Sequence, residues 1–290
     1  MIGLKRGTVQ LFDHEKEWEV EAQRTIEKLW KILGSIAKDI QHVGSTSILS
    51  VKAKPIIDIA VAVDDFSQIL ALEAELKENG FYYRPKSELG DQLLFASGSL
   101  YEGTGDMQTH FVHVVRAGSM EWINYINFRN YLNKTPAAAK AYEDLKVSLA
   151  EAVPIDAGRE KYLAGKHDFI VYTLRKAMVY SYLGKTVDIE IDRPIGTVHP
   201  KHDDIIYPIN YGYIPGVLGG DGEELDVYVL GASEPINKCS VRIIGIVHRR
   251  NDIEDKLAGV IGDANYSAEE INSAIHFQEQ FYDSYVEIME

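Results

Sequence analysis

The amino-acid sequence predicts an α+β protein of two domains, and three observations support this. The chain has 290 residues, which suits two ordinary domains. Its charge changes sharply near residue 183: residues 1–182 carry 24 acidic and 22 basic side chains, whereas residues 183–290 carry 20 and 8. The hydrophobic pattern changes at the same place, from strands mixed with helices to short strands and turns. We therefore expect domains at 1–182 and 183–290, joined at Leu183-Gly184-Lys185.

The first domain is expected to be a mixed sheet with helices packed against it. Apolar residues recur at helical spacing over 14–33, and Gly34 is placed to end that helix. The remaining pattern predicts strands at 40–43, 56–63, 81–84, 93–96 and 110–115 and a helix at 66–78. From 121 to 182 it predicts helix in three pieces, broken around Thr135-Pro136 and Val153-Pro154.

The second domain is expected to be a small β-barrel with one closing helix. Strand patterns cover residues 187–191, 227–230 and 241–248, and a stretch rich in Pro, Gly and Tyr runs from 193 to 222. Residues 268–282 have helical spacing, and Ser267 is a suitable N-cap. Its surplus of acids has two interpretations, a solvated acidic surface or a carboxylate cage for divalent metal.

Composition excludes several classes of protein. The net charge of −14 opposes a nucleic-acid partner, because binding a phosphate polymer requires a basic surface. The sequence has no apolar run of the ~18 residues that a membrane span needs, and its first residues lack the apolar core of a secretory signal. The single cysteine, Cys239, cannot form an internal disulfide. We therefore expect a cytoplasmic protein with neither membrane nor nucleic acid as partner, and its oligomeric state stays open.

The first motif is a phosphate-binding turn followed by a carboxylate on a strand. Gly44 lets the backbone approach an anion, and Ser45 offers an N–H and a hydroxyl at the start of a short helix. Asp58 lies in the next apolar strand, where it would hold Mg²⁺ against the phosphates of a nucleotide. Lys54, like Lys146 and Lys166, is a candidate for neutralising phosphate, and the alternative for each is an ordinary surface lysine.

These residues belong to a wider resemblance. His42-Val43-Gly44-Ser45-Thr46-Ser47, Lys54-Pro55-Ile56-Ile57-Asp58-Ile59, Phe128-Arg129-Asn130-Tyr131-Leu132, Tyr142…Leu145-Lys146 and Tyr162…Lys166 together resemble the GrpB-like family. The resemblance covers nearly all of residues 7–178 and implies a nucleotidyltransferase-type fold. Such enzymes place a second acid two positions after the first, where this chain has Ala60. His110 or His113 is the candidate replacement, and the alternative for each is a histidine packed on a strand.

The second motif is a group of acids spaced to converge on metal. Asp221, Glu223 and Asp226 lie on one turn that enters a strand, and Gly222 permits that turn. Further along the chain, Asp252, Asp255 and the cation Lys256 follow one another closely. Like charges at such density cost free energy unless a metal ion offsets them. The alternative is an acidic turn that is simply solvated.

This motif resembles the Mg²⁺-dependent soluble inorganic pyrophosphatases. The segments Asn210-Tyr211-Gly212-Tyr213 and Asp221-Gly222-Glu223-Glu224-Leu225-Asp226 carry the resemblance, which covers about residues 185–283. It implies that Asp221, Asp226, Asp252 and Asp255 bind Mg²⁺, or alternatively Mn²⁺, and that one carboxylate, with Glu223 as candidate, deprotonates a metal-bound water. It further implies that Tyr211, Lys256 and Glu190 shape the diphosphate site, while Arg193 or Lys201 stands in for the family's phosphate-binding arginine.

Three hypotheses for the whole chain follow. The first is a Mg²⁺-dependent hydrolase of diphosphate, or of a related phosphoanhydride, tethered to a nucleotidyltransferase-like domain whose released diphosphate it would remove. The second is a degenerate regulator that binds a nucleotide or diphosphate without turnover, and it is motivated by Ala60 and by Phe281-Tyr282 at the family's Tyr-Lys position. The third is an interaction scaffold without metal.

Overall fold

The chain forms two compact units, which are described separately. The computed structural model describes residues 1–85, 91–199, 202–219, 222–252 and 254–288. The units are Met1–Leu174 and Arg175–Glu290, and the division falls inside helix α8 (His167–Tyr180), before the domain boundary expected at residue 183. No helix in the described ranges has the length and apolar character needed to cross a membrane.

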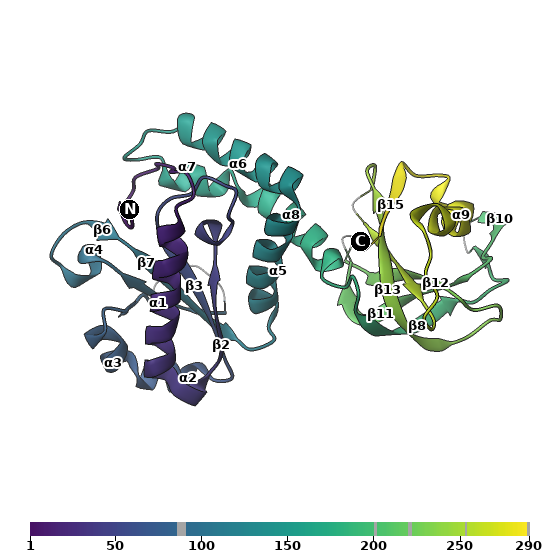
Figure 1. The fold of residues 1–290 in the computed structure, drawn as a ribbon, viewed down its shortest axis with the longest axis horizontal. Helices are drawn as coiled ribbons and strands as arrows, with labels where there is room; N and C mark the ends of the chain where they lie inside the picture. The colour runs from purple at the N-terminus through teal and green to yellow at the C-terminus, as the bar shows by residue number, and fades with distance from the viewer. Residues whose placement is uncertain (86–90, 200–201, 220–221, 253, 289–290) are drawn as a thin grey trace. The chain divides into compact units, whose positions relative to one another are not determined.

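The first unit is built on a five-stranded mixed sheet (Figure 1). In spatial order its strands are β2 (Ala37–Val43), β3 (Ile57–Val63), β7 (His110–Arg116), β5 (Leu93–Ser97) and β4 (Tyr82–Tyr83). β3 and β7 run parallel, and the other neighbours are antiparallel. The strands predicted in this part of the sequence are all present.

Helix α1 (Lys16–Leu33) covers one face of this sheet (Figure 1). Its Trp18 and Leu29 share one hydrophobic core with Ile59 of β3 and Val112 of β7. Gly34 ends the helix, as predicted, and opens the short 3-10 helix η1 (Gly34–Ile36).

The opposite face carries the helices that follow β7. They are α5 (Met120–Lys134), α6 (Pro136–Glu151), α7 (Arg159–Ala164) and α8. α5 contacts β2, β3 and β7, and its Tyr125 hydroxyl lies 3.0 Å from Nδ1 of His113, a side chain that alternation along β7 turns away from α1. This layer encloses the face on which the candidate site lies.

Two helix predictions need correction. The helix expected at 66–78 is two helices, α2 (Phe66–Ala71) and α3 (Glu73–Glu78), because the N–H of Leu72 bonds to the carbonyl of Ile69 in a tighter turn. The third helical piece expected before residue 182 is likewise two helices, α7 and α8. The strands β1 (Leu4–Lys5) and β6 (Met107–Gln108), which pair with each other, and the helix α4 (Ser99–Glu102) were not predicted.

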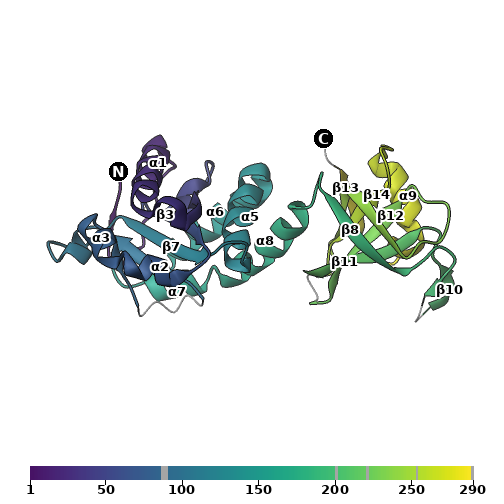
Figure 2. The same ribbon diagram turned by 90° about the horizontal axis from the view of Figure 1, so that it is seen from below.

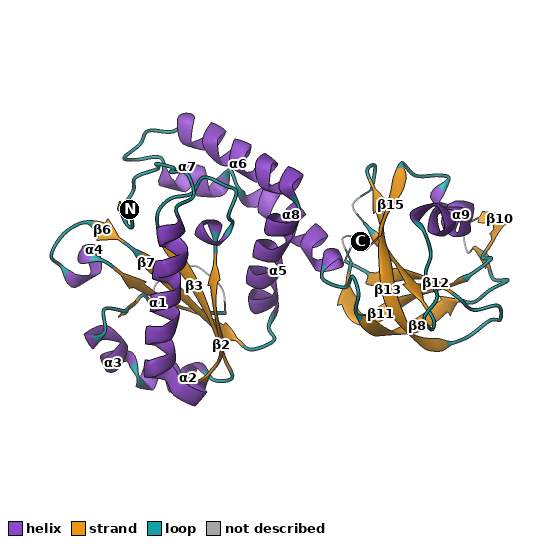
Figure 3. Cartoon of the chain, in the orientation of Figure 1, coloured by secondary structure: helices purple, strands orange, loops and turns teal. Residues whose placement is uncertain are grey.

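The second unit contains a closed five-stranded barrel, whose strands are orange in Figure 3. Its strands follow one another in the order β14 (Lys256–Val260), β12 (Glu224–Leu230), β11 (Asn210–Leu218), β8 (Thr186–Arg193) and β13 (Lys238–Arg249). The long strand β13 pairs with both β8 and β14, which closes the ring, and β15 (Ser284–Ile288) extends it along β13. Separately from the barrel, β9 (Val198–His199) and β10 (His202–Ile206) pair antiparallel.

One helix, α9 (Ala268–Glu279), packs on the barrel (Figure 2). Ser267 and Glu270 form a reciprocal capping box at its start, so the predicted cap is confirmed. Ile271 and Ile275 are fully buried in one core with Tyr228 of β12. The predicted fold class, α+β with an N-terminal mixed sheet and a small C-terminal barrel closed by a helix, is therefore confirmed.

The end of α8 is attached to the barrel by a buried charge network. Nζ of Lys176 lies 2.6 Å from Oδ2 of Asp255, and Nδ1 of His248 lies 2.8 Å from the same oxygen. The backbone N–H of Arg249 also donates to Asp255. Burial alone would raise the pKa of Asp255, but His248 and Lys176 outweigh that effect and lower it. The ionised Asp255 therefore stabilises the folded unit.

The segment Asn210-Tyr211-Gly212 fixes the barrel's backbone at β11. Oδ1 of the fully buried Asn210 accepts hydrogen bonds from the N–H groups of Ile195 and Ile236, 3.1 and 3.2 Å away. Gly212 passes so close to β8 that a Cβ atom would lie 2.0 Å from the carbonyl oxygen of Glu190. A side chain at position 212 would therefore push two paired strands apart.

We expect Gly212→Ala to lower the free energy of unfolding of the second unit by about 3 kcal/mol, because backbone atoms cannot move out of the way of the added Cβ. The matched control is Gly216→Ala on the same strand, where no atom lies within 4 Å of the added Cβ and only the positive φ of 73° opposes the change. The control should cost about 1 kcal/mol. Urea denaturation measures both, and equal losses would contradict the close approach.

We expect Asp255→Asn to destabilise the second unit by about 3 kcal/mol at pH 7, because it leaves the buried Lys176 and His248 facing a neutral group. Since the pKa of Asp255 is lowered, its contribution is complete above the ordinary aspartate pKa of about 3.9 and is lost as the pH falls through the folded-state pKa. The difference between wild type and variant should therefore shrink in acid. A difference that stays constant from pH 7 to the acid limit would contradict this role.

Candidate functional site

Side-chain alternation along the parallel strands β3 and β7 assembles the first group of site residues. Ile57 and Ile59 point into the core under α1, so Asp58 points to the opposite face. On β7 the same rule turns His113 to the face of Asp58, and Nε2 of His113 lies 3.6 Å from Oδ1 of Asp58. His110 has the opposite parity: it lies 3.5 Å from Glu21 of α1. Of the two histidines considered from sequence, the structure therefore brings only His113 to Asp58.

The Gly44-Ser45 turn packs directly against Asp58. Gly44 has a φ of 69°, and a Cβ atom there would lie 2.3 Å from Oδ2 of Asp58. Ser45 opens the short helix η2 (Ser45–Ser47), as expected, and its hydroxyl lies 3.1 Å from the hydroxyl of Tyr142. The absence of a side chain at Gly44 therefore serves the close fit of a carboxylate. The predicted approach of an anion to this turn stays a prediction.

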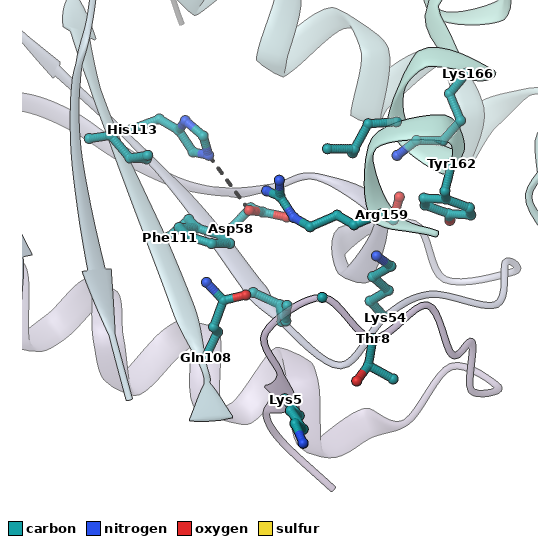
Figure 4. A pocket seen from close by; sticks show the side chains of 15 residues that line it. Lys5, Thr8, Lys54, Asp58, Gln108, Phe111, His113, Arg159, Tyr162 and Lys166 are labelled. Carbon is teal, nitrogen blue, oxygen red and sulfur yellow. Dashed lines mark ion pairs between the residues drawn. The ribbon is translucent and has the colours of Figure 1, made fainter. Parts of the chain in front are cut away.

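Two cavities adjoin on this face and share Ser45, Asp58 and Lys166 in their walls. One of about 280 Å³, shown in Figure 4, is bordered by four basic side chains, Lys5, Lys54, Arg159 and Lys166, with Asp58 at one side. The other, of about 350 Å³, is bordered by the rings of Tyr125, Phe128 and Tyr142 and by polar groups that include Gln92 and Asn124. The N-terminal unit thus has a cationic compartment beside an aromatic one.

Two of the four basic side chains of the first cavity lie against one aromatic ring. Nζ of Lys54 lies 4.6 Å from the ring centroid of Tyr162, and Nζ of Lys166 lies 4.7 Å from it (Figure 4). Burial lowers the pKa of Lys54 to about 8, with repulsion from Lys166 and Arg159 adding to the shift. Burial likewise lowers the pKa of Lys166 to about 8, although Asp58 partly opposes it. Lys146, by contrast, is fully buried and donates to the carbonyl of Lys52, which is a structural contact.

In the second unit, the charged side chains of the candidate site form a row across neighbouring strands. Lys256 on β14 contacts the carboxylate of Asp226 on β12, and its Nζ lies 2.8 Å from Oε2 of Glu254. The ring of Tyr211 on β11 has its centroid 5.5 Å from the same Nζ. Burial, with the adjacent Asp226 adding to it, raises the pKa of Tyr211 well above its usual value, so its hydroxyl stays protonated and can donate.

The next strand, β8, adds further charged side chains to this row. Tyr211 pairs with Arg193, and Tyr213 pairs with Glu190. The guanidinium of Arg193 lies 2.6 Å from Asp192, while the carboxylate of Glu190 contacts Lys238 and accepts a 3.1 Å hydrogen bond from Tyr213. Burial raises the pKa of Asp192, and the nearby Asp226 also contributes. These strands bring Tyr211, Lys256, Asp226 and Arg193 into one region.

Within the described residues the acids proposed from sequence do not gather in one place, and their convergence on a metal ion stays a prediction, because Asp221 lies outside the described residues. Asp255 faces Lys176 and His248, and Oδ2 of Asp252 accepts from Arg249 at 3.1 Å. Because consecutive residues of an extended chain point to opposite sides, Asp255 and its neighbour Lys256 face different partners. In the described ranges, no three His, Cys, Asp or Glu side chains are placed to hold one metal ion.

The sequence offered three further candidates, Glu223, Asp221 and Lys201. Glu223 lies exposed on the turn before β12. Asp221 and Lys201 lie outside the described residues. Their roles as metal ligand, catalytic group and phosphate-binding cation stay predictions from sequence, as does the role of Glu223 as a base.

The described donors nevertheless suit a divalent ion in kind. Mg²⁺ prefers oxygen ligands, carboxylates above all. Asp226 and Glu254 both direct a carboxylate oxygen at one positive charge, the ammonium of Lys256. Two carboxylates that converge on a cation in the chain itself can also converge on a bound one.

Sequence reasoning missed two residues, Glu254 and Arg159. Glu254 had a usable signal, because it lies two positions before Lys256 and so shares its side of an extended chain, whereas the aspartate chosen from sequence, Asp255, does not. Arg159 had no local signal. It opens α7, about a hundred residues after Asp58 in sequence, and only the fold brings it to the cavity.

Comparison with known proteins identifies the first unit. The family model of the GrpB protein matches residues 8–176. Glutamate-rich protein GrpB of Alkalihalophilus pseudofirmus is 36% identical over 171 residues, which cover 59% of this chain and 96% of that protein. The crystal structure of conserved protein GrpB from Enterococcus faecalis is similar with a TM-score of 0.53 and 28% identity, covering 60% of this chain and 99% of that one.

The second unit matches a different family. The family model of inorganic pyrophosphatase covers residues 179–287. The inorganic pyrophosphatase of Saccharolobus solfataricus is 34% identical over 86 residues, which are 29% of this chain and 46% of that protein. The chain therefore spans less than half the length of this curated relative. Taken together, the matches show that the chain belongs to the GrpB family and consists of an N-terminal GrpB domain fused to a C-terminal inorganic pyrophosphatase domain.

Proposed function

We propose that the C-terminal domain binds and hydrolyses inorganic diphosphate, or a related phosphoanhydride, with Mg²⁺ as its ion and Mn²⁺ as the alternative. The observation that carries the proposal is the convergence of Asp226, Glu254 and Tyr211 on Lys256 across neighbouring barrel strands. This arrangement places cation, carboxylate and hydroxyl donor together, which are the groups that binding a diphosphate and a divalent ion requires.

Each residue has a defined part in this proposal. Hydrolysis adds water across the P–O–P bridge and yields two orthophosphates. The ammonium of Lys256 and the guanidinium of Arg193 meet phosphate oxygens, and the protonated Tyr211 hydroxyl donates to one of them. Asp226 and Glu254 would hold Mg²⁺, which would supply positive charge to offset the charge of the diphosphate. Asp221 and Asp252 are further candidate ligands, and Glu223 is the candidate base, all three from sequence.

A second candidate function is diphosphate binding without turnover, as in a regulator. The observation that favours it is that each described acid of the predicted cage already has a basic partner: Lys256 for Asp226, Arg249 for Asp252 and Lys176 for Asp255. Charges satisfied within the chain have less to gain from a bound ion.

Nucleotidyl transfer by the first domain has weaker support. Ala60 lies two residues after Asp58 on the same side of β3, so the side chain next to Asp58 on that face is a methyl group. Two-metal transfer chemistry requires more than one carboxylate to hold its ions. We therefore do not extend the proposal to transfer.

We expect Asp226→Asn to reduce Mg²⁺-dependent phosphate release from diphosphate by at least about 100-fold, because a group that contacts ion and substrate loses its charge. Lys256 keeps Glu254 as a partner, so the melting temperature should change little. The matched control is Asp283→Asn, which removes a surface partner of Arg250 and should leave phosphate release unchanged. Wild-type release from the Asp226 variant would refute the assigned site.

Removal of divalent ions separates the two candidate functions. With a chelator present, a Mg²⁺-dependent hydrolase releases no phosphate, and added Mg²⁺ restores release. A regulator instead gives a higher melting temperature with diphosphate and Mg²⁺ but no phosphate at any enzyme concentration. A phosphate-release assay run beside a thermal melt distinguishes these outcomes. Release that persists in chelator would contradict the need for an ion.

A further inference from the structure

The cationic cavity of the first domain holds positive charge that its own carboxylates do not neutralise. Four basic side chains border it, and Asp58 is the acidic residue in its wall. Within the described residues, no carboxylate lies within the 4.0 Å ion-pair distance of Lys54, Arg159 or Lys166. This cavity is therefore electrostatically prepared for an anion, in a chain whose net charge is −14.

The position of the lysines supports an anion-binding role for this cavity. Lys54 and Lys166 lie against the ring of Tyr162, which attracts both ammonium groups without cancelling their charge. Burial lowers the pKa of each to about 8. Repulsion from Lys166 and Arg159 adds to the shift of Lys54, and repulsion from Arg159 adds to the shift of Lys166. An anion placed between them would relieve that repulsion. Figure 4 shows that Arg159 points across the same cavity in the direction of Asp58.

The neighbouring cavity indicates which chemical group is attached to the anion. Its wall includes the rings of Tyr125, Phe128 and Tyr142, the amides of Gln92 and Asn124, and one further carboxylate, that of Glu121. Rings stack on planar groups, and amides read hydrogen-bonding edges. Because the cavities share Ser45, Asp58 and Lys166, one ligand can occupy both, and volumes of about 280 and 350 Å³ together suit a small organic molecule.

From this arrangement we infer that the first domain binds an organic polyphosphate that carries a planar ring, with its phosphates held by Lys54, Arg159 and Lys166 and its ring in the aromatic cavity. The basic side chains supply the neutralising charge, so binding does not depend on a divalent ion. This site is independent of the diphosphate site proposed for the barrel.

The inference is tested with the full chain carrying Asp226→Asn, in chelator, with ATP as the probe and calorimetry as the measurement. ATP should bind at least about tenfold more tightly than either adenosine or inorganic tripolyphosphate, since each lacks half of the contacts. The double variant Arg159→Met/Lys166→Met should weaken ATP binding by at least about 100-fold. The matched control Lys161→Met, which removes an exposed lysine of the same helix α7, should change it little.

Each contrary outcome overturns a defined part of the inference. Equal affinities for ATP and tripolyphosphate would show that the aromatic cavity is not part of the binding site. ATP binding that appears only with Mg²⁺ would contradict the claim that the basic side chains neutralise the phosphates. ATP binding that survives the double variant places the ligand elsewhere, including the barrel. Phe128→Ala supplies a second test, because it should weaken ATP while leaving tripolyphosphate unaffected. Melting temperatures of all variants establish that they are folded.

The affinity should also depend on pH. Lys54 is faced by Lys166, Arg159 and Tyr162, and Lys166 is faced by Asp58, Arg159 and Tyr162, while Lys5 and His113 lie further along the same wall. Raising the pH from 7 to 9 crosses the pKa of about 8 of both lysines. They lose charge, so ATP affinity should fall about tenfold. An affinity that is constant over this range would contradict a contribution from these two lysines.

Discussion

The alternation of side chains along an extended chain determines which charged groups meet in both domains. In the GrpB domain, the apolar residues of β3 and β7 that pack under α1 force Asp58 and His113 together on the other face and send His110 away from them. In the barrel, the same period joins Glu254 to Lys256 and turns Asp255 toward Lys176. A shift of one residue in either register would exchange these partners and dismantle the sites.

This constraint also explains the different uses of charge in the barrel. Its surplus of acids does not form one cage in the described residues, because strand geometry distributes the acids over separate cations. Asp255 joins Lys176 and His248 in a buried network, where the ions attach the C-terminal end of α8, which belongs to the same unit, to the barrel. Asp226 remains partly exposed beside Lys256, where solvent and a ligand can still reach it. The difference in burial therefore gives Asp255 a role in stability and leaves Asp226 available to a ligand.

The sequence predicted most of the fold because apolar periodicity is a local property. The helix that ends at Gly34, the strand that carries Asp58 and the Ser267 cap all depend on neighbouring residues, and all were found. Local pattern could not reveal the break at Leu72, where one hydrogen bond tightens a turn. Nor could it reveal which strand closes the predicted barrel, because β13 does so by pairing with two distant strands. For the site, motif spacing indicated Asp226 and Lys256 correctly as neighbours. It also indicated Asp255 where the structure has Glu254, because the spacing of acids along the chain does not tell which face each one occupies. Arg159 reaches its cavity only through the packing of α7, which no short window contains.

The two domains also differ in how a buried cation is stabilised, and this difference bears on what each can bind. In the barrel, Lys176 and Arg249 are held by carboxylates at 2.6 Å, so their charge is compensated inside the chain. In the GrpB domain, Lys54 and Lys166 are held by the ring of Tyr162, and a ring quadrupole lowers the energy of an ammonium while leaving its net charge intact. Lys176 and Arg249 therefore contribute mainly to stability, because a new anion would first have to displace their carboxylates. A cation in a cavity that no carboxylate pairs with retains its attraction for an incoming anion. Burial of that charge lowers the pKa of both lysines, although Asp58 partly opposes the shift of Lys166.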